Sequence, residues 1–226
     1  MVPIKKGRPP QAFVSELKDY EAANGKLPSW EEIRCKSEVT AALVREQGGL
    51  CAYCMSRIEA GWRGSIQDAH VEHILPQSKS AHGEDVDYGN MLAVCEGKHG
   101  ESRASWSCDR SRGNASMTVN PLRPQTLQSI RYRGDGTILS DDADVNDDLN
   151  NVLNLNGSRA GLKRNRKAVI DSLNTVLQAK GKRGGERAVK KYCRERLGVL
   201  SKLDADGKYV PYVGVPRFFL EKRLRR

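Results

Sequence analysis

The chain has 226 residues, enough for one or two domains with a substantial apolar core. It contains no apolar run of about 18 residues and no N-terminal apolar stretch of signal-peptide length, so we expect neither a membrane span nor secretion. In the cytoplasmic protein that this predicts, the six cysteines act as metal ligands or free thiols rather than disulfides.

The net charge of +10 is unevenly distributed. Residues 157–226 hold 20 Lys and Arg against 6 Asp and Glu, whereas the rest of the chain holds 18 basic and 22 acidic residues. Basic side chains that replace phosphate counterions gain affinity for a polyanion, so the C-terminal third suits nucleic acid. A solvated helical surface explains the same composition equally well.

The N-terminal region is predicted to be an extended arm, residues 1–12, followed by helices in residues 13–48. Basic residues and adjacent prolines favour the arm. Apolar residues at helical spacing predict a first helix that Gly25 ends. Ser29 and Glu32 form a capping-box pattern, which predicts a second helix from Trp30 to about residue 43 or 45.

Residues 126–226 are predicted to form a hairpin and a basic helical region. Gly134-Asp135-Gly136 separates two β-prone runs, and the Asp- and Asn-rich residues 141–151 suggest a solvated loop before a short helix. Apolar periodicity predicts a long helix over residues 158–180, a break at 181–185 and another basic helix after it. The polar side of the long helix carries four candidate phosphate contacts: Lys163, Arg164, Arg166 and Lys167.

Two pairs of cysteines in residues 49–125 predict a structural zinc site. Cys51 and Cys54 have the Cys-x-x-Cys spacing that places two thiolates on one metal from a tight turn. Cys95 and Cys108 are the natural completing pair, separated by an inserted loop. The four cysteines would then enclose one zinc ion.

Two alternatives compete with this interpretation. His99 lies four residues after Cys95 and would complete a site of three cysteines and one histidine, leaving Cys108 free. A lone Cys-x-x-Cys is also compatible with a redox switch, but no thioredoxin-like βαβ pattern surrounds this one.

The acidic residue Glu72, directly followed by His73, is the second chemical feature. A neutral imidazole with a pKa of about 6.5 can take a proton from water at physiological pH. The adjacent carboxylate can bind a hard divalent cation. Pro76 is expected to end the strand soon after, which leaves His73 near a strand end. The alternative is a structural histidine that is buried and hydrogen-bonded. The position of His73 between the two zinc half-sites favours a catalytic role.

Residues 108–113 supply the third feature. Asp109, beside a zinc-anchored cysteine, is expected to be a second oxygen ligand of the catalytic cation, and Arg112 to pair with phosphate through two N–H groups. A structural explanation fits the same residues: Asp109 would lie in the first turn of a helix, where an acidic side chain interacts favourably with the helix dipole. The two interpretations are compatible. Asn90, before an apolar pair, is expected to brace the loop that carries His73 rather than bind metal.

Together these residues resemble the HNH (ββα-metal) endonucleases. The resemblance implies that Glu72 is the metal-binding acid, His73 the general base, Asn90 the central asparagine and Asp109 the final metal ligand. It also implies one catalytic Mg²⁺ or Mn²⁺ and a core of two strands and a helix built around structural zinc. The sequence departs from the family in its stretched second cysteine pair, and in Asp109, which stands where the family has His or Asn and leaves His99 as an alternative ligand.

Over most of the chain the closest resemblance is to PtuB-type HNH nucleases of Septu and retron-associated antiphage systems of bacteria. It is carried by the Lys-Lys-Gly-Arg-Pro-Pro-Gln arm, Cys-Ala-Tyr-Cys, Val-Glu-His-Ile-Leu-Pro-Gln-Ser and the Leu-Asn-Leu-Asn segment at 153–156. The resemblance implies a PtuA-like ABC/SMC-type ATPase as partner and, in retron versions, a reverse transcriptase with its DNA–RNA product.

The sequence therefore predicts an α+β fold with a ββα-metal core and four-cysteine zinc site embedded in helices. The expected function is hydrolysis of nucleic-acid phosphodiesters, with DNA favoured and RNA as the other substrate. A zinc-stabilised nucleic-acid-binding or adaptor module without catalysis is the alternative.

Overall fold

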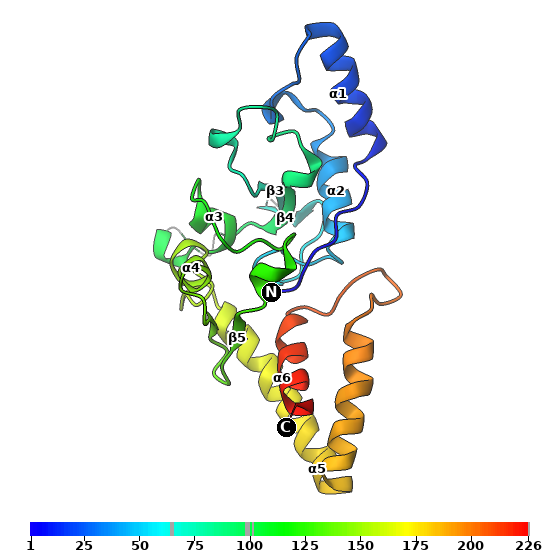
Figure 1. Cartoon of the computed structure of the whole chain (residues 1–226), viewed down its shortest axis with the longest axis vertical. Coiled ribbons are helices and arrows are strands. Elements are labelled where there is room, and N and C mark those ends of the chain that lie inside the picture. Colours follow the sequence, from blue (N-terminus) through cyan, green and yellow to red (C-terminus); the bar gives the residue numbers. More distant parts are fainter. Residues whose placement is uncertain (64–65, 98–99, 101, 226) are drawn as a thin grey trace.

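The computed structural model describes residues 1–63, 66–97, 100 and 102–225, which form an elongated α+β molecule (Figure 1). The α+β class predicted from the sequence is confirmed. Three antiparallel two-stranded sheets lie in the described part: β1 (Trp62–Arg63) with β2 (Ile66–Gln67), β3 (Ala69–His73) with β4 (Met91–Cys95), and β5 (Ile130–Tyr132) with β6 (Ile138–Ser140). None of the described helices is both long and apolar enough to cross a membrane.

The N-terminal arm runs along the body of the molecule before helix α1 (Gln11–Asn24) begins. Its backbone is held where the N–H of Ile4 donates to the carbonyl of Pro121 at 2.9 Å. Lys6 Nζ donates to the carboxylate of Glu46 at 2.6 Å. Helix α1 ends at Gly25, which has the left-handed φ of 67° that favours glycine.

The second helix begins later than the sequence predicted. The capping box of Ser29 and Glu32 forms, but it starts only a 3-10 turn, η1 (Trp30–Glu32), and α2 spans Lys36–Glu46. The backbone N–H groups of residues 34 and 35 donate to the Glu16 carboxylate at 2.7 and 3.0 Å. Because this contact with α1 satisfies donors that a helix end leaves unpaired, the chain stays non-helical between η1 and α2.

Strands β3 and β4 and the short helix α3 (Cys108–Arg112) form the centre of the molecule. The register pairs Glu72 with Leu92 and His73 with Met91. Helix α2 packs against both strands, and α3 packs against β4. Strand β3 ends at His73, three residues before Pro76, as the sequence predicted.

The predicted hairpin around residues 134–136 is present as β5 and β6, but the predicted loop at 141–151 is mostly helical. It contains α4 (Ala143–Asp147) and the π-helical turn η6 (Asp148–Val152). Asp142 caps α4, and Asp148 is buried, where its Oδ2 accepts the backbone N–H groups of residues 118 and 119 at 2.7 and 2.8 Å. These acidic residues therefore serve as acceptors for backbone donors rather than as a solvated loop.

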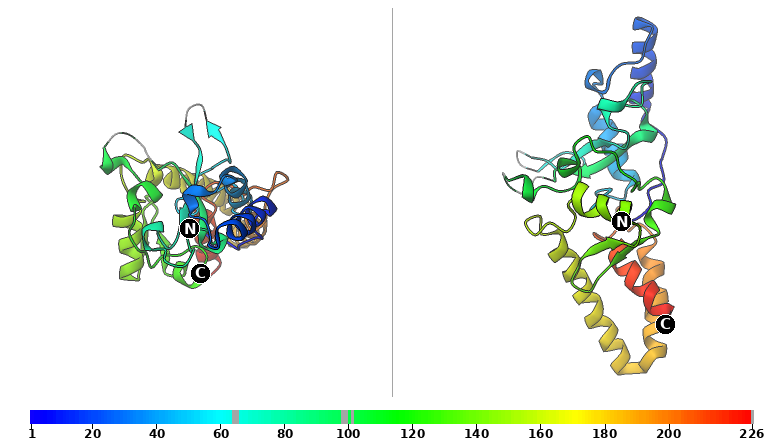
Figure 2. Two further views of the ribbon diagram at one scale, coloured as in Figure 1. Left: turned by 90° about the horizontal axis from the view of Figure 1, so that it is seen from above. Right: turned by 60° about the vertical axis from the view of Figure 1, so that its left-hand side comes forward.

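The C-terminal region is a helical hairpin that projects from the body (Figure 1 and Figure 2). Helix α5 (Leu162–Leu200) reverses direction at Gly184 and Gly185, and α6 (Gly214–Leu224) packs against it. Gly185 has φ 61° and ψ −160°, a conformation accessible essentially to glycine alone. The predicted break at residues 181–185 is thus confined to its last two residues.

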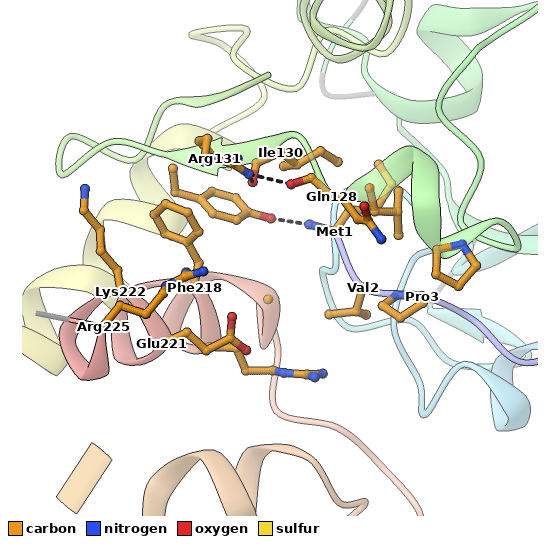
Figure 3. A pocket seen from close by; sticks show the side chains of 15 residues that line it. Met1, Val2, Pro3, Gln128, Ile130, Arg131, Phe218, Glu221, Lys222 and Arg225 are labelled. Carbon is orange, nitrogen blue, oxygen red and sulfur yellow. Dashed lines mark hydrogen bonds between the residues drawn. The ribbon is translucent and has the colours of Figure 1, made fainter. Parts of the chain in front are cut away.

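A cavity of about 610 Å³ lies between the N-terminal arm, β5 and α6 (Figure 3). At its edge the buried amino group of Met1 donates to the hydroxyl of Tyr132. Burial lowers the pKa of this amino group to about 4. None of the candidate catalytic residues lines the cavity, so it is separate from the site described next.

Candidate metal and catalytic site

The four cysteines meet at one point although they come from three parts of the chain. Their sulfur atoms all lie within 4.8 Å of one another. The Sγ atoms of Cys51 and Cys108 are 3.9 Å apart, and those of Cys54 and Cys95 are 3.8 Å apart. A regular tetrahedron with zinc–sulfur distances of about 2.3 Å has sulfur–sulfur edges of about 3.8 Å. The cluster can therefore hold a metal ion such as zinc with four thiolate ligands.

Two residues with left-handed backbone conformations shape this cluster. Met55 has φ 63°, and its N–H donates to the carbonyl of Cys51 at 3.0 Å, which closes the turn around the first cysteine pair. Cys108 has φ 54°, and its N–H donates to the carbonyl of Leu153 at 2.9 Å. Asn154, the next residue, donates to the carbonyl of Trp106 at 2.7 Å. The Leu-Asn-Leu-Asn segment thus fixes the start of α3.

The thiols interact strongly with one another. Hydrogen bonds from Cys108, and then from Cys51 and Cys95, lower the pKa of the Cys54 thiol well below its usual value. Metal ligation by cysteine requires the thiolate, so this shift favours metal binding. His99, the alternative ligand, lies outside the described residues.

A second polar cluster centres on Glu72. This side chain is 7% exposed, and its carboxylate accepts from the hydroxyl of Tyr53 at 3.0 Å, accepts from the guanidinium of Arg112, and interacts directly with Asp109. Asp109, in the first turn of α3, is only half-buried, so it marks the solvent side of the pair. The structure thus brings together the two acids that the sequence proposed as ligands of a catalytic cation.

Burial and the neighbouring charge of Asp109 raise the pKa of Glu72 to about 8, although the Arg112 guanidinium opposes this shift. The dominant cause is the loss of solvation of a buried carboxylate. A divalent cation held by the two carboxyl groups would offset the desolvation of Glu72 and its repulsion by Asp109. Both groups would then stay ionised. The pair is therefore chemically suited to a hard divalent cation with oxygen ligands.

His73 is held in one orientation and one tautomer. Its Nε2 lies 2.9 Å from the carbonyl oxygen of Asp85, and the ring of Trp30 packs edge-on against it with the ring centroids 5.5 Å apart. Because a carbonyl oxygen only accepts, Nε2 carries the proton and Nδ1 keeps its lone pair. Burial lowers the pKa of His73, which favours the neutral ring at pH 7.

Asn90 braces the loop that follows His73, which is the role the sequence predicted. Its Oδ1 accepts the backbone N–H of Leu75 at 2.8 Å, and its Nδ2 donates to the carbonyls of Leu75 and Glu84 at 3.1 and 2.9 Å. Glu84 directly precedes Asp85, so Asn90 also positions the carbonyl that orients His73.

We expect Asn90→Ala to lower the free energy of unfolding by about 2–3 kcal/mol, because it removes three largely buried hydrogen bonds worth about 1 kcal/mol each. Urea denaturation measures this loss. Asn24→Ala is the matched control, since Asn24 is exposed and makes a single bond, to the carbonyl of Tyr20 at 2.9 Å. Equal losses in the two variants would contradict the bracing role.

Arg112 does not occupy the phosphate-contacting position that the sequence suggested. Its side chain is 1% exposed. The guanidinium donates to Glu72 and to the backbone carbonyls of His73, Ile74 and Ala115 at 2.7, 2.6 and 2.9 Å. These bonds tie α3 to the end of β3, so Arg112 positions the acidic pair instead of reaching outward.

The basic cluster at 163–167 also differs from its prediction. Arg166 is 1% exposed, and its guanidinium donates to the carbonyls of Gly136 and Leu155 at 2.7 and 2.9 Å and to Asn156 Oδ1 at 2.8 Å. Four thiolates around a dication leave two net negative charges, and Arg166 lies close enough to Cys54 and Cys108 to interact with their charge. Arg166 therefore links the cysteine cluster to α5, and it is not on the exposed face.

Arg166→Met is expected to lower the free energy of unfolding by about 3 kcal/mol, because three buried acceptors lose their donor. For a chain of this size that loss corresponds to a melting temperature about 6–12 °C lower in thermal unfolding. Arg164→Met, two residues away and exposed, is the control and should melt within about 2 °C of the wild type. A stable Arg166→Met protein would show that the bonds of Arg166 are dispensable.

Sequence reasoning missed three groups of this site: the Tyr53 hydroxyl, the Trp30 ring and the Asp85 carbonyl. Tyr53 stands inside the Cys-x-x-Cys motif, which was the one available signal. Trp30 and Asp85 come from loops distant in sequence from His73, and no local pattern connects them to it. No model of a known protein family matches the chain, and no curated protein is significantly similar to it.

Proposed function

We propose that the protein is a metal-dependent endonuclease of the HNH type that hydrolyses nucleic-acid phosphodiesters. The observation that carries the proposal is the bond from His73 Nε2 to the Asp85 carbonyl, in a ring that interacts electrostatically with Asp109. This bond makes Nδ1 the basic nitrogen of a neutral imidazole.

In the proposed reaction, His73 Nδ1 accepts a proton from the water that attacks phosphorus. The ester P–O bond opposite the attacking water breaks, and its oxygen leaves with one of the two strand ends and takes up a proton from solvent. The carbonyl of Asp85 keeps the proton on Nε2 and stabilises the imidazolium that forms. Trp30 restricts rotation of the ring, and Asn90 holds the loop that supplies the carbonyl. Each of these groups contributes by pre-orienting the base.

Glu72 and Asp109 would hold the catalytic cation, Mg²⁺ or Mn²⁺. When bound, this cation supplies Lewis-acid stabilisation of the negative charge that develops on the phosphate. Tyr53 and Arg112 fix the carboxylate of Glu72 so that it cannot turn away from Asp109. The four cysteines would hold structural zinc and anchor the start of α3, and so place Asp109.

The chain order of two antiparallel strands followed by a helix, with Glu72 and His73 at the end of β3 and Asp109 on α3, supports a ββα-metal core. The sequence resemblance supports a role as the effector nuclease of a bacterial antiphage system with a PtuA-like ATPase partner. In the retron arrangement, a reverse transcriptase and its DNA–RNA product would also bind.

The test is cleavage of supercoiled plasmid DNA and of structured RNA by zinc-loaded protein with Mg²⁺ or Mn²⁺, alone and with a PtuA-like partner. Nicked or linear plasmid from the wild type, and none from Glu72→Gln, supports the proposal. Absence of cleavage of either substrate by folded, zinc-loaded protein under all these conditions refutes it.

A non-catalytic zinc-stabilised binding module is the second candidate. The observation in its favour is the buried ion pair of Arg112 and Glu72, which a purely structural core would also retain. The two candidates differ in one outcome, because the binding module retains nucleic-acid affinity and cleaves nothing.

A further inference from the structure

The basic cluster expected to bind phosphate is largely engaged within the protein. Lys163 Nζ lies 2.8 Å from Asp135, and Lys167 Nζ lies 2.5 Å from Asp171. Arg166 is buried, as described above. Among the four residues, Arg164 alone is exposed and has no acidic partner in the described part of the chain. The surface that takes up a polyanion must therefore be sought elsewhere in the basic C-terminal region.

The second arm of α5 carries cations along one side. Helical residues three or four positions apart share a face, and four basic residues follow this spacing. The buried residues of this arm, Val189, Cys193 and Leu200, lie about 130° around the helix from them at 100° per residue. We call the four cations the basic face: Arg187, Lys190, Lys191 and Arg194.

The acidic residues of α5 leave most of the basic face without a partner. Asp171 pairs with Lys167, and Glu186 pairs with Arg223 at 2.5 Å. Glu195 reaches only Lys191, at a distance of 3.9 Å and in an exposed pair. Arg187, Lys190 and Arg194 have no acidic side chain within 4.0 Å anywhere among the residues that the structure describes. Uncompensated charge of this density favours a polyanionic ligand.

The helical hairpin places this face at a distance from the candidate catalytic centre. Helix α5 starts beside the Leu-Asn-Leu-Asn segment that holds Cys108, and its first arm of about 22 residues extends roughly 33 Å before the reversal at Gly185. The hairpin therefore projects from the body, and the basic face lies near its far end (Figure 1 and Figure 2). The basic face lies two to nine residues after Gly185, so it is about 20–30 Å from the start of α5 along the hairpin.

We propose that the basic face binds the phosphate backbone of duplex DNA at a distance from the scissile bond. The assignment of duplex DNA rests on the proposed nuclease function. Duplex DNA has a persistence length of about 50 nm, so it stays straight across this span, whereas a flexible single strand does not. With a rise of about 3.4 Å per base pair, this span corresponds to about 6–9 base pairs.

The test compares two full-length variants that lose equal charge. One carries Arg187→Gln, Lys190→Gln and Arg194→Gln; the control carries Lys18→Gln, Lys26→Gln and Arg34→Gln, three exposed cations at the opposite end of the molecule. Binding of an end-labelled 40-base-pair duplex and of an end-labelled 40-nucleotide single strand is measured by fluorescence anisotropy, without divalent cation, over a series of NaCl concentrations.

For the 40-base-pair duplex, the basic-face variant should bind at least about tenfold more weakly at 0.1 M salt, and the slope of log K against log salt should flatten by about 2 to 3. The control should bind the duplex as the wild type does, and the wild type should bind the single strand more weakly than the duplex. Wild-type affinity in the basic-face variant, or an equal loss in the control, would overturn the proposal, as would stronger wild-type binding to a single strand.

Cleavage measured in parallel separates this inference from the proposed function. The basic-face variant should raise KM for a long duplex and leave kcat within about twofold. If the wild type binds through the basic face and cleaves nothing, the nuclease proposal fails and the binding surface stands. If cleavage occurs with an unchanged KM in the variant, the binding surface is wrong and the nuclease stands.

Discussion

Replacing Cys108 with serine is expected to release the metal and unfold the centre of the molecule. A structural four-thiolate zinc site contributes about 10–16 kcal/mol of metal-binding free energy that is coupled to folding, which equals or exceeds the whole stability of a typical domain. Cys108 also begins α3 and lies in a strained conformation at φ 54°. We expect the zinc content to fall from one per chain to near zero, and the melting temperature to fall by more than about 15 °C.

Cys35→Ser is the control for this prediction. Cys35 lies before α2, outside the sulfur cluster, and burial with a hydrogen bond to Glu16 raises the pKa of its thiol to about 12. This variant should keep one zinc per chain and a melting temperature near that of the wild type. Zinc content by atomic emission and melting by circular dichroism give both values. Full zinc content in Cys108→Ser would favour His99 as the fourth ligand.

His73→Ala is expected to lower the cleavage rate by about 10²–10⁴-fold, the usual contribution of a general base. The four cysteines take no part in the hydrogen bond or the ring contact of His73, so we expect zinc content and folding to be retained. The measurement is the single-turnover rate on a long DNA duplex at saturating Mn²⁺.

The chain offers a second histidine on the same strand as control. His70 is three residues earlier on β3, is partly exposed, and contacts Glu96 at 2.5 Å. His70→Ala should cleave within about threefold of the wild type. A similar loss in both variants would indicate that the strand tolerates no substitution, and an active His73→Ala would exclude His73 as the base.

The sequence identified those parts of the site whose chemistry is local. A Cys-x-x-Cys turn, an acidic residue beside a histidine and an asparagine before a strand each have a role that neighbouring residues define. The structure brings Cys51, Cys54, Cys95 and Cys108 together and places Glu72 beside Asp109, as the pattern suggested.

The two arginines could not be predicted in the same way. Arg112 and Arg166 stand in basic helical stretches and therefore suggested exposed phosphate contacts. The structure buries both because backbone carbonyls at turns, such as those of Ile74 and Gly136, need donors that the local chain does not provide. Such acceptors arise from tertiary packing and leave no periodic signal in the sequence.

Helix boundaries show the same limit. The capping box of Ser29 and Glu32 was read correctly from the sequence, but the carboxylate of Glu16, from another helix, redirected the chain after one turn. Glycine positions were more informative, because the need for a left-handed backbone at Gly185 is a property of the residue itself.

The most direct test of the central claim is a Mn²⁺ titration of the zinc-loaded wild type, with single-turnover cleavage of a long DNA duplex as the readout. We predict a rate that rises and saturates with Mn²⁺ at constant zinc content, and a much higher half-saturating concentration for Asp109→Ala, which removes the oxygen ligand. A folded, zinc-loaded protein that binds the duplex and cleaves it at no Mn²⁺ concentration would contradict the account.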